Sequence, residues 1–145
     1  MFLDAQNLFS NAQAITAAAN STNVIDTRDV RDVGSGEDIY IFLTVTTSFT
    51  DSGSDSTLAV ALVTDDNAAL SSPATVRTLV TLPALTAAGT TLYFKLEAEN
   101  LVAFQRYIGL VYTPAGGNLT TGSITAGLVR GIQQDRKYAS GFSIS

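Results

Sequence analysis

The stretch Ile39–Thr47, IYIFLTVTT, decides the fold. Large apolar side chains recur at every second position, with Ile39, Ile41, Leu43 and Val45 on one side of an extended chain. This period of two is the pattern of a β-strand with one face in a core. A second run of the same kind, Thr57–Thr64, follows after a short Ser-, Gly- and Asp-rich stretch. We expect that stretch to form a hairpin loop.

Further alternating runs continue to residue 130, separated by Pro, Gly and Asn residues that favour turns. About seven or eight short strands with a turn signal every ten residues or so indicate a sandwich or a barrel. We therefore predict an all-β fold, an antiparallel β-sandwich of about eight strands, within one domain that spans residues 1–145. The other expected strands are Val24–Asp26, Thr75–Leu82, Thr91–Leu96, Gln105–Thr113 and Ser123–Arg130.

The two ends of the chain lack this strand pattern. The Ala-rich segment Asn7–Ala19 is compatible with an amphipathic helical turn or with an extended arm. We treat residues 1–22 as an N-terminal arm and residues 133–145 as a polar C-terminal tail. Each large apolar side chain left in water forgoes about 1.5–3 kcal/mol of burial. We therefore expect those in the two ends to contact another chain, namely Phe2, Leu3, Leu8, Phe9, Tyr138 and Phe142.

The composition lacks two of the residue types that most often carry out catalysis or bind metals. The chain has no histidine and no cysteine, which removes the commonest general base, the strongest nucleophile and the usual soft metal ligands. We expect a protein that is not an enzyme and that needs no metal or cofactor. A net charge of −5 argues against nucleic-acid binding. No apolar run approaches the ~20 residues of a membrane span, and the first residues lack the basic region of a secretory signal.

A few polar positions invite a chemical interpretation. Asp65 and Asp66 are adjacent carboxylates, but they precede Asn67 in a turn-like sequence, and a glycosidase needs two carboxyls on either side of a bond. Asp51 and Asp55 lie in the Ser- and Gly-rich loop, where Ser and Gly occupy the positions that calcium ligands would need. Both groups therefore favour a turn. Arg106, next to Tyr107, is expected to form an ion pair.

Several segments resemble the capsid cement (decoration) proteins of tailed bacteriophages, in particular the small jelly-roll type known from Bordetella phage. The N-terminal segments FLDA, LFS and AQAIT are the most specific part of the resemblance. It continues in order along most of the chain, through residues 21–26 (STNVID), 32–34 (DVG), 62–66 (LVTDD), 71–73 (SSP), 106–108 (RYI) and 125–128 (TAGL). Residues 133–145 match nothing in that family.

The resemblance implies a non-enzymatic jelly roll in the virion, made in the host cytoplasm and bound to the outer surface of the phage head. Its implied partners are the major capsid protein, whose neighbouring subunits it would cement, and further copies of itself in a trimer or dimer. A low charged fraction of 14% suits a chain that works in an assembly. The alternative is a receptor- or glycan-binding β-sandwich module, which would need an exposed aromatic or polar pocket.

Overall fold

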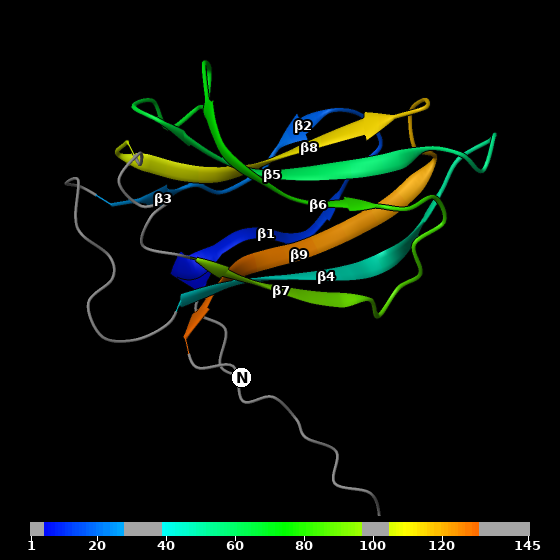
Figure 1. The fold of residues 1–145 in the computed structure, drawn as a ribbon, viewed down its shortest axis with the longest axis horizontal. Helices are drawn as coiled ribbons and strands as arrows, with labels where there is room; N and C mark the ends of the chain where they lie inside the picture. The colour runs from blue at the N-terminus through cyan, green and yellow to red at the C-terminus, as the bar shows by residue number, and fades with distance from the viewer. Residues whose placement is uncertain (1–4, 28–38, 97–104, 131–145) are drawn as a thin grey trace, which may run out of the picture.

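The computed structural model describes residues 5–27, 39–96 and 105–130. Within these ranges the chain forms a short 3-10 helix, η1 (Ala5–Asn7), and nine strands in two layers (Figure 1). The strands are β1 (Leu8–Ala14), β2 (Ala19–Asn20), β3 (Ile25–Asp26), β4 (Ile39–Thr50), β5 (Thr57–Asp65), β6 (Ala74–Leu82), β7 (Thr91–Leu96), β8 (Tyr107–Ala115) and β9 (Thr121–Arg130).

The strand order defines the fold as a jelly roll. One sheet has the order β1-β9-β4-β7, and the other has the order β2-β8-β5-β6, with β3 pairing with β8 beyond β2. All the pairings are antiparallel. If β2 and β3 are counted as one interrupted edge strand, the two sheets have four strands each, which is the arrangement of a jelly roll. The predicted all-β sandwich of about eight strands is confirmed.

The predicted strands agree with the observed ones to within a few residues, but the first connection differs. We expected the loop that contains Asp51 and Asp55 to close a hairpin. Instead β4 and β5 lie in different sheets, so this loop crosses from one layer to the other. The reason is that β9 and β7 occupy both edges of β4, which leaves no edge for β5.

The core is the apolar layer between the two sheets. The alternation in β4 places Ile41, Leu43 and Val45 in this layer, where each is fully buried. From the opposite sheet, Leu62 of β5 and Leu110 of β8 pack into the same cluster. The period of two that identified β4 in the sequence follows from this inward face, although Phe42 on the outer face is also buried.

The N-terminal segment belongs to this core, so our prediction of an arm is wrong for residues 8–22. Residues Leu8–Ala14 form β1 and pair with β9, and Phe9 and Ile15 are fully buried. Of the two conformations that the sequence left open for this segment, the structure shows the extended one. The sequence hides the strand because β1 is irregular: its register shifts twice against β9, and Ala12 has a φ of 46°.

A buried polar contact ties β1 to the opposite sheet. The hydroxyls of Ser10 on β1 and Tyr112 on β8 lie 2.7 Å apart, and both residues are fully buried. The Ser10 hydroxyl also donates to the Gln13 side chain, which in turn accepts from the Thr22 amide. Buried hydroxyls that lack such partners are costly, so this network fixes the path of the N-terminal segment.

Replacement of Phe9 by alanine tests the corrected role of β1. We expect Phe9→Ala to lower the free energy of unfolding by about 3–5 kcal/mol, because it opens a cavity in a closed core. Urea unfolding followed by circular dichroism measures this loss. Leu8→Ala, at a half-buried neighbour, is the matched control and should cost less. Equal, small losses for both variants would contradict the core position of Phe9.

Gly122 occupies a position that no other residue fits well. Its φ is +143°, and a methyl group on its α-carbon would overlap the buried ring of Phe49 on β4. β9 therefore passes close to β4 at a point where the register of the two strands also shifts. Only glycine allows both the backbone conformation and the close approach of the ring.

We expect Gly122→Ala to destabilise the fold by roughly 2–4 kcal/mol, because it combines overpacking with an unfavourable φ. Gly89 is a matched control, since its φ is +90° but nothing lies within 4 Å of the added methyl group. Gly89→Ala should therefore cost about 1 kcal/mol, from the backbone alone. Thermal melting of the two variants separates these terms, and equal shifts would argue against the clash with Phe49.

Candidate binding surfaces

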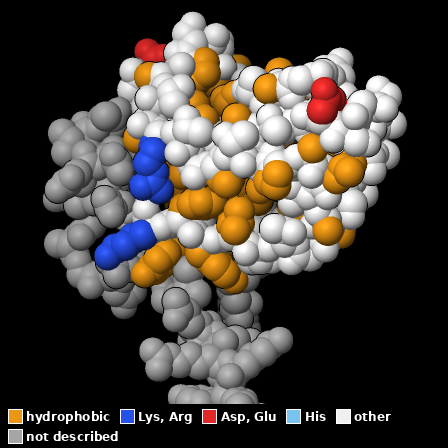
Figure 2. Space-filling model, turned by 45° about the vertical axis from the view of Figure 1, so that its right-hand side comes forward, with side chains coloured by type: hydrophobic (Ala, Val, Ile, Leu, Met, Phe, Trp, Pro, Cys, Tyr) orange, Lys and Arg blue, Asp and Glu red, His pale blue; other side chains and the backbone are white. Residues whose placement is uncertain are grey.

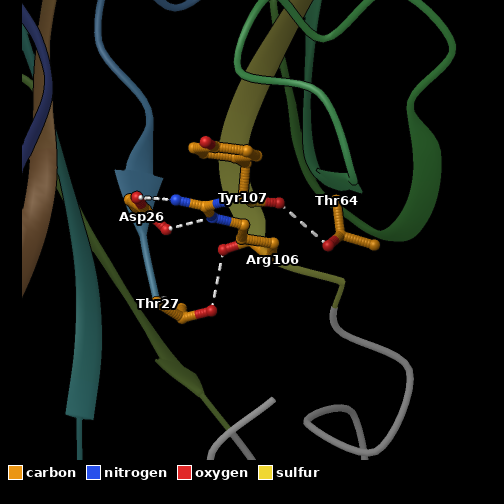
Figure 3. Close-up of polar contacts among 5 residues, drawn as sticks. All are labelled: Asp26, Thr27, Thr64, Arg106 and Tyr107. Carbon is orange, nitrogen blue, oxygen red and sulfur yellow. Dashed lines mark hydrogen bonds and ion pairs between the residues drawn. The ribbon is translucent and has the colours of Figure 1, made fainter. Parts of the chain in front are cut away.

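The most ordered group of charged side chains joins β3 to the start of β8. The Arg106 guanidinium donates from Nε and Nη2 to the two carboxylate oxygens of Asp26, each at 2.9 Å (Figure 3). The guanidinium also lies 5.0 Å from the centre of the Tyr107 ring. The amide and hydroxyl of Thr27 both donate to the Arg106 carbonyl, at 2.9 and 2.7 Å. The ion pair expected for Arg106 is confirmed.

This group holds the backbone at one corner of the sandwich. The Thr64 hydroxyl donates to the Tyr107 carbonyl, and the Gln105 amide donates to the Thr64 hydroxyl, so β5 is tied to the same corner. The Arg106 side chain is 53% exposed. An exposed ion pair of this kind contributes between about zero and 1 kcal/mol. Its role is therefore to fix the position of the short strand β3.

The two candidate carboxylate sites are turns. Asp65, at the end of β5, is buried and accepts the amides of Asn67 and Ser72 at 3.1 and 2.9 Å. Asp51, before β5, accepts the Ser56 hydroxyl at 2.8 Å and two backbone amides at 3.2 Å. In both places a carboxylate satisfies loop amides. Among the described residues, no three His, Cys, Asp or Glu side chains are grouped so that they could hold a metal ion.

The same contacts determine how these groups titrate. The Ser72 amide, with further hydrogen bonds from Asn67 and Asp66, keeps the pKa of Asp65 below its usual value, although burial opposes this. Burial raises the pKa of Asp51, but hydrogen bonds from Ser56 and Asp55 outweigh it and the net pKa is lowered. A lowered pKa means that the folded state binds protons less readily than the unfolded state. The stability that these groups contribute is therefore present above about pH 4 and is lost as the pH falls.

Acid unfolding tests this assignment. We expect the free energy of unfolding to decrease as the pH falls from about 5 to 2, and to decrease less steeply in Asp65→Asn, which removes one of the titrating groups. Thr113→Ser, at an exposed position of β8, changes no titrating group; it is the control and should keep the wild-type slope. An unchanged slope in Asp65→Asn would contradict a role for its ionised carboxylate in holding the turn.

An apolar seam runs along one side of the sandwich, between the edge strands β6 and β7. Figure 2 shows the apolar side chains gathered in a band on this face, next to two basic residues. The Arg77 guanidinium of β6 donates to the Lys95 carbonyl of β7 at 3.3 Å, which bridges the two sheets. Six partly buried side chains pack against the core along the seam: Val76, Leu79, Val80, Leu92, Phe94 and Leu96.

The seam is the surface that sequence analysis missed. Both strands were predicted from the sequence, but no surface was assigned to either of them. Only the topology reveals that these strands end the two sheets on the same side, so that the residues between them are half-covered. Two further large apolar side chains near this side are exposed, Leu85 at 50% and Tyr93 at 42%. No pattern within either strand distinguishes an edge from a central position.

The six residues that we predicted to contact another chain have different positions in the structure. Phe9 lies in the core, which corrects its prediction as an anchor for another chain. Leu8 is half-buried and packs on the outer face of its sheet, where the absence of a side chain at Gly127 makes room for it beside Phe42. Phe2, Leu3, Tyr138 and Phe142 lie outside the described residues.

The connections outside the described residues all join the same end of the sandwich. Residues 28–38 lead into Ile39, residues 97–104 follow Leu96, and residues 131–145 follow Arg130. Ile39 pairs with both Leu96 and Arg130, so the three attachment points lie side by side. Residues 1–4 precede η1, which contacts β9. The described residues at which these four segments attach therefore lie at one end of the sandwich, at the left of Figure 1.

These features define a class of protein. The described residues form a jelly roll with a partly buried apolar seam along one side, and jelly rolls are the fold of many viral capsid and lectin domains. No described helix is long and apolar enough to cross a membrane.

Comparison with known proteins gives the family. The model of the Bbp16 family matches residues 9–128, and the chain therefore belongs to the Bbp16 family. The family is named after a protein of a Bordetella phage, in agreement with the resemblance noted from the sequence and with a virion protein. No curated protein matches the chain. The matched range begins within β1 and ends within β9, so it contains nearly the whole jelly roll.

Proposed function

We propose that the protein is a structural component of a phage virion that binds the outer surface of the head and cements neighbouring major capsid protein subunits. The observation that carries this proposal is the Bbp16 match over almost the entire jelly roll. The family ties the chain to a phage, and the fold is one that viral shells use repeatedly. In this proposal the protein is not an enzyme, and its partners are the coat protein and further copies of itself.

The mechanism is the sum of many weak contacts. A phage head repeats the same coat surface many times, so a trimer or dimer that contacts several subunits gains avidity without one tight interface. A binding surface of this kind needs side chains that can be desolvated without leaving charges unpaired. The seam between β6 and β7 offers such a surface, with six partly buried apolar residues and two basic ones. The low charged fraction of the chain, 14%, also favours association.

The end that carries four sequence segments supports a second contact. Binding residues are commonly placed on loops that a rigid scaffold positions. Here β4, β7 and β9 end side by side, and the group formed by Asp26, Arg106 and Tyr107 fixes the neighbouring corner of the other sheet. We propose that this end of the sandwich faces the coat protein, while the seam serves contacts between copies.

Reconstitution on phage heads tests the proposal. Heads from a phage that lacks the gene for this protein are mixed with the purified full-length chain, and binding is measured by co-sedimentation. We expect saturable binding at a fixed ratio to the coat protein, density on the outer surface in cryo-electron microscopy, and a higher temperature of DNA release from the decorated heads. Arg106→Met, on the proposed contact end, is expected to weaken binding more than Thr113→Ser on an exposed strand position away from it.

Two outcomes would overturn the proposal. Density in the tail or its fibres, with none on the head, would place the protein elsewhere in the virion. Binding to a glycan array, together with no binding to heads, would favour the alternative of a receptor- or glycan-binding module.

A further inference from the structure

We infer that the seam between β6 and β7 is a docking site for the C-terminal segment Tyr138–Ser145 of a second copy of this chain, which adds to the free edge of β7 as an extra strand. The inference rests on the homo-oligomer proposed above and names the surface and the segment that form it. Addition of an extended segment to a sheet edge is a recurring mode of association, in which main-chain hydrogen bonds give affinity and alternate side chains fill pockets.

The seam has what such a segment requires. Within the described residues, neither β6 nor β7 has a strand partner on its outer side. The pairing of β6 with β5 contains two register shifts, at Leu79 and Val76, which twist that edge, and both side chains pack partly buried against the core. β7 pairs with β4 in unbroken register from Thr91 to Leu96. The regular edge of β7 is therefore the one that can accept another strand.

The C-terminal sequence has the matching pattern. From residue 138 onward it reads YASGFSIS, so Tyr138, Phe142 and Ile144 occupy alternate positions, with Ser140 between them. The intervening positions are all small: Ala139, Gly141, Ser143 and Ser145. In an extended chain this arrangement places every large side chain on one face. One face can then enter an apolar seam while the small residues face outward.

The length of the C-terminal segment and the direction of β9 both agree with a docked segment that comes from a second copy. Residues 131–145 can extend about 50 Å from Arg130, whereas eight residues in a strand cover about 26 Å, comparable to the length of β6 at about 30 Å. β9 runs in the same direction as β7 and ends at the same end of the sheet, because Ile39 pairs with both Arg130 and Leu96. A segment that continued in this direction would pass beyond the end of its own seam. A neighbour placed at that end receives the segment without a reversal. Repeated around an axis, the exchange closes a ring.

Cysteine cross-linking tests the contact directly, because the natural chain has no cysteine. Full-length Thr91→Cys and full-length Ser143→Cys are mixed and oxidised gently. We expect an interchain disulfide at least 10-fold more abundant than in a mixture of Thr113→Cys and Ser143→Cys. Thr91 and Thr113 are both exposed, but Thr91 is on the edge of β7 and Thr113 is in the middle of a sheet. An equal yield in the two mixtures overturns the inference.

Oligomerisation provides the second measurement. The triple variant Tyr138→Ser, Phe142→Ser, Ile144→Ser should raise the dissociation constant of the oligomer by roughly 100-fold or more in sedimentation experiments, because three apolar anchors are lost. The matched control changes only two small residues, Ala139→Ser and Ser143→Ala. Its dissociation constant should stay within a few-fold of the wild-type value. Similar dissociation constants for the two variants, or a wild-type chain that sediments only as a monomer, overturn the inference.

These tests distinguish docking between two copies from docking within one chain. They also distinguish failure of this inference from failure of the proposed function. In a variant with both Thr91→Cys and Ser143→Cys, an exclusively intrachain disulfide overturns the proposed exchange between copies. Wild-type protein that binds heads while the cross-link is absent overturns this inference and leaves the proposed function standing. A cross-link that forms in a protein with no affinity for heads overturns the proposed function and leaves the docking of Tyr138–Ser145 standing.

Discussion

Burial of a single apolar layer between two four-stranded sheets is the constraint on which the rest of this molecule depends. Ile41, Leu43 and Val45 on one side meet Leu62 and Leu110 on the other, and all are fully or almost fully buried. Because such a layer excludes water, any polar group that enters it needs a partner, and the Tyr112 and Ser10 hydroxyls supply each other with one. Burial raises the pKa of Tyr112, since the phenolate would lose its hydration there. The same contact makes the N-terminal strand part of the fold.

The strand pattern was readable from the sequence because it follows directly from this burial. Apart from β6, whose pairing contains two register shifts, each strand from β4 to β9 presents alternate side chains to the core, so a period of two marked them in advance. β1 escaped the pattern, because its register shifts and the φ of 46° at Ala12 break the alternation between Phe9 and Ile15. The pairing of the strands was also out of reach. Nothing local to Asp51–Asp55 distinguishes a hairpin loop from one that crosses between the sheets.

The candidate surfaces were harder to anticipate, for a related reason. A seam arises where two edge strands meet, and edge position is a property of the topology rather than of either strand. Val80 and Phe94 have the same alternation as the residues of central strands and differ only in what covers them. The ion pair of Arg106 was predicted only as a type of contact, because its partner Asp26 lies 80 residues away in the sequence. The sequence alone therefore predicted the type of contact that a polar side chain makes better than it predicted a surface formed between two strands.

The geometry also explains why a sandwich of this kind suits an assembly. A jelly roll has four sheet edges, and full closure into a barrel is the only arrangement that removes edges altogether. Here β1 and the interrupted strand β2/β3 form one pair of edges. The Gln13 side chain of β1 joins them, because it donates to the Asn20 carbonyl of β2 and accepts from the Thr22 amide. On the other side, the Arg77 side chain of β6 donates to the Lys95 carbonyl of β7. Six partly buried apolar side chains lie along this second pair of edges, so association with another chain buries surface that folding leaves half-covered.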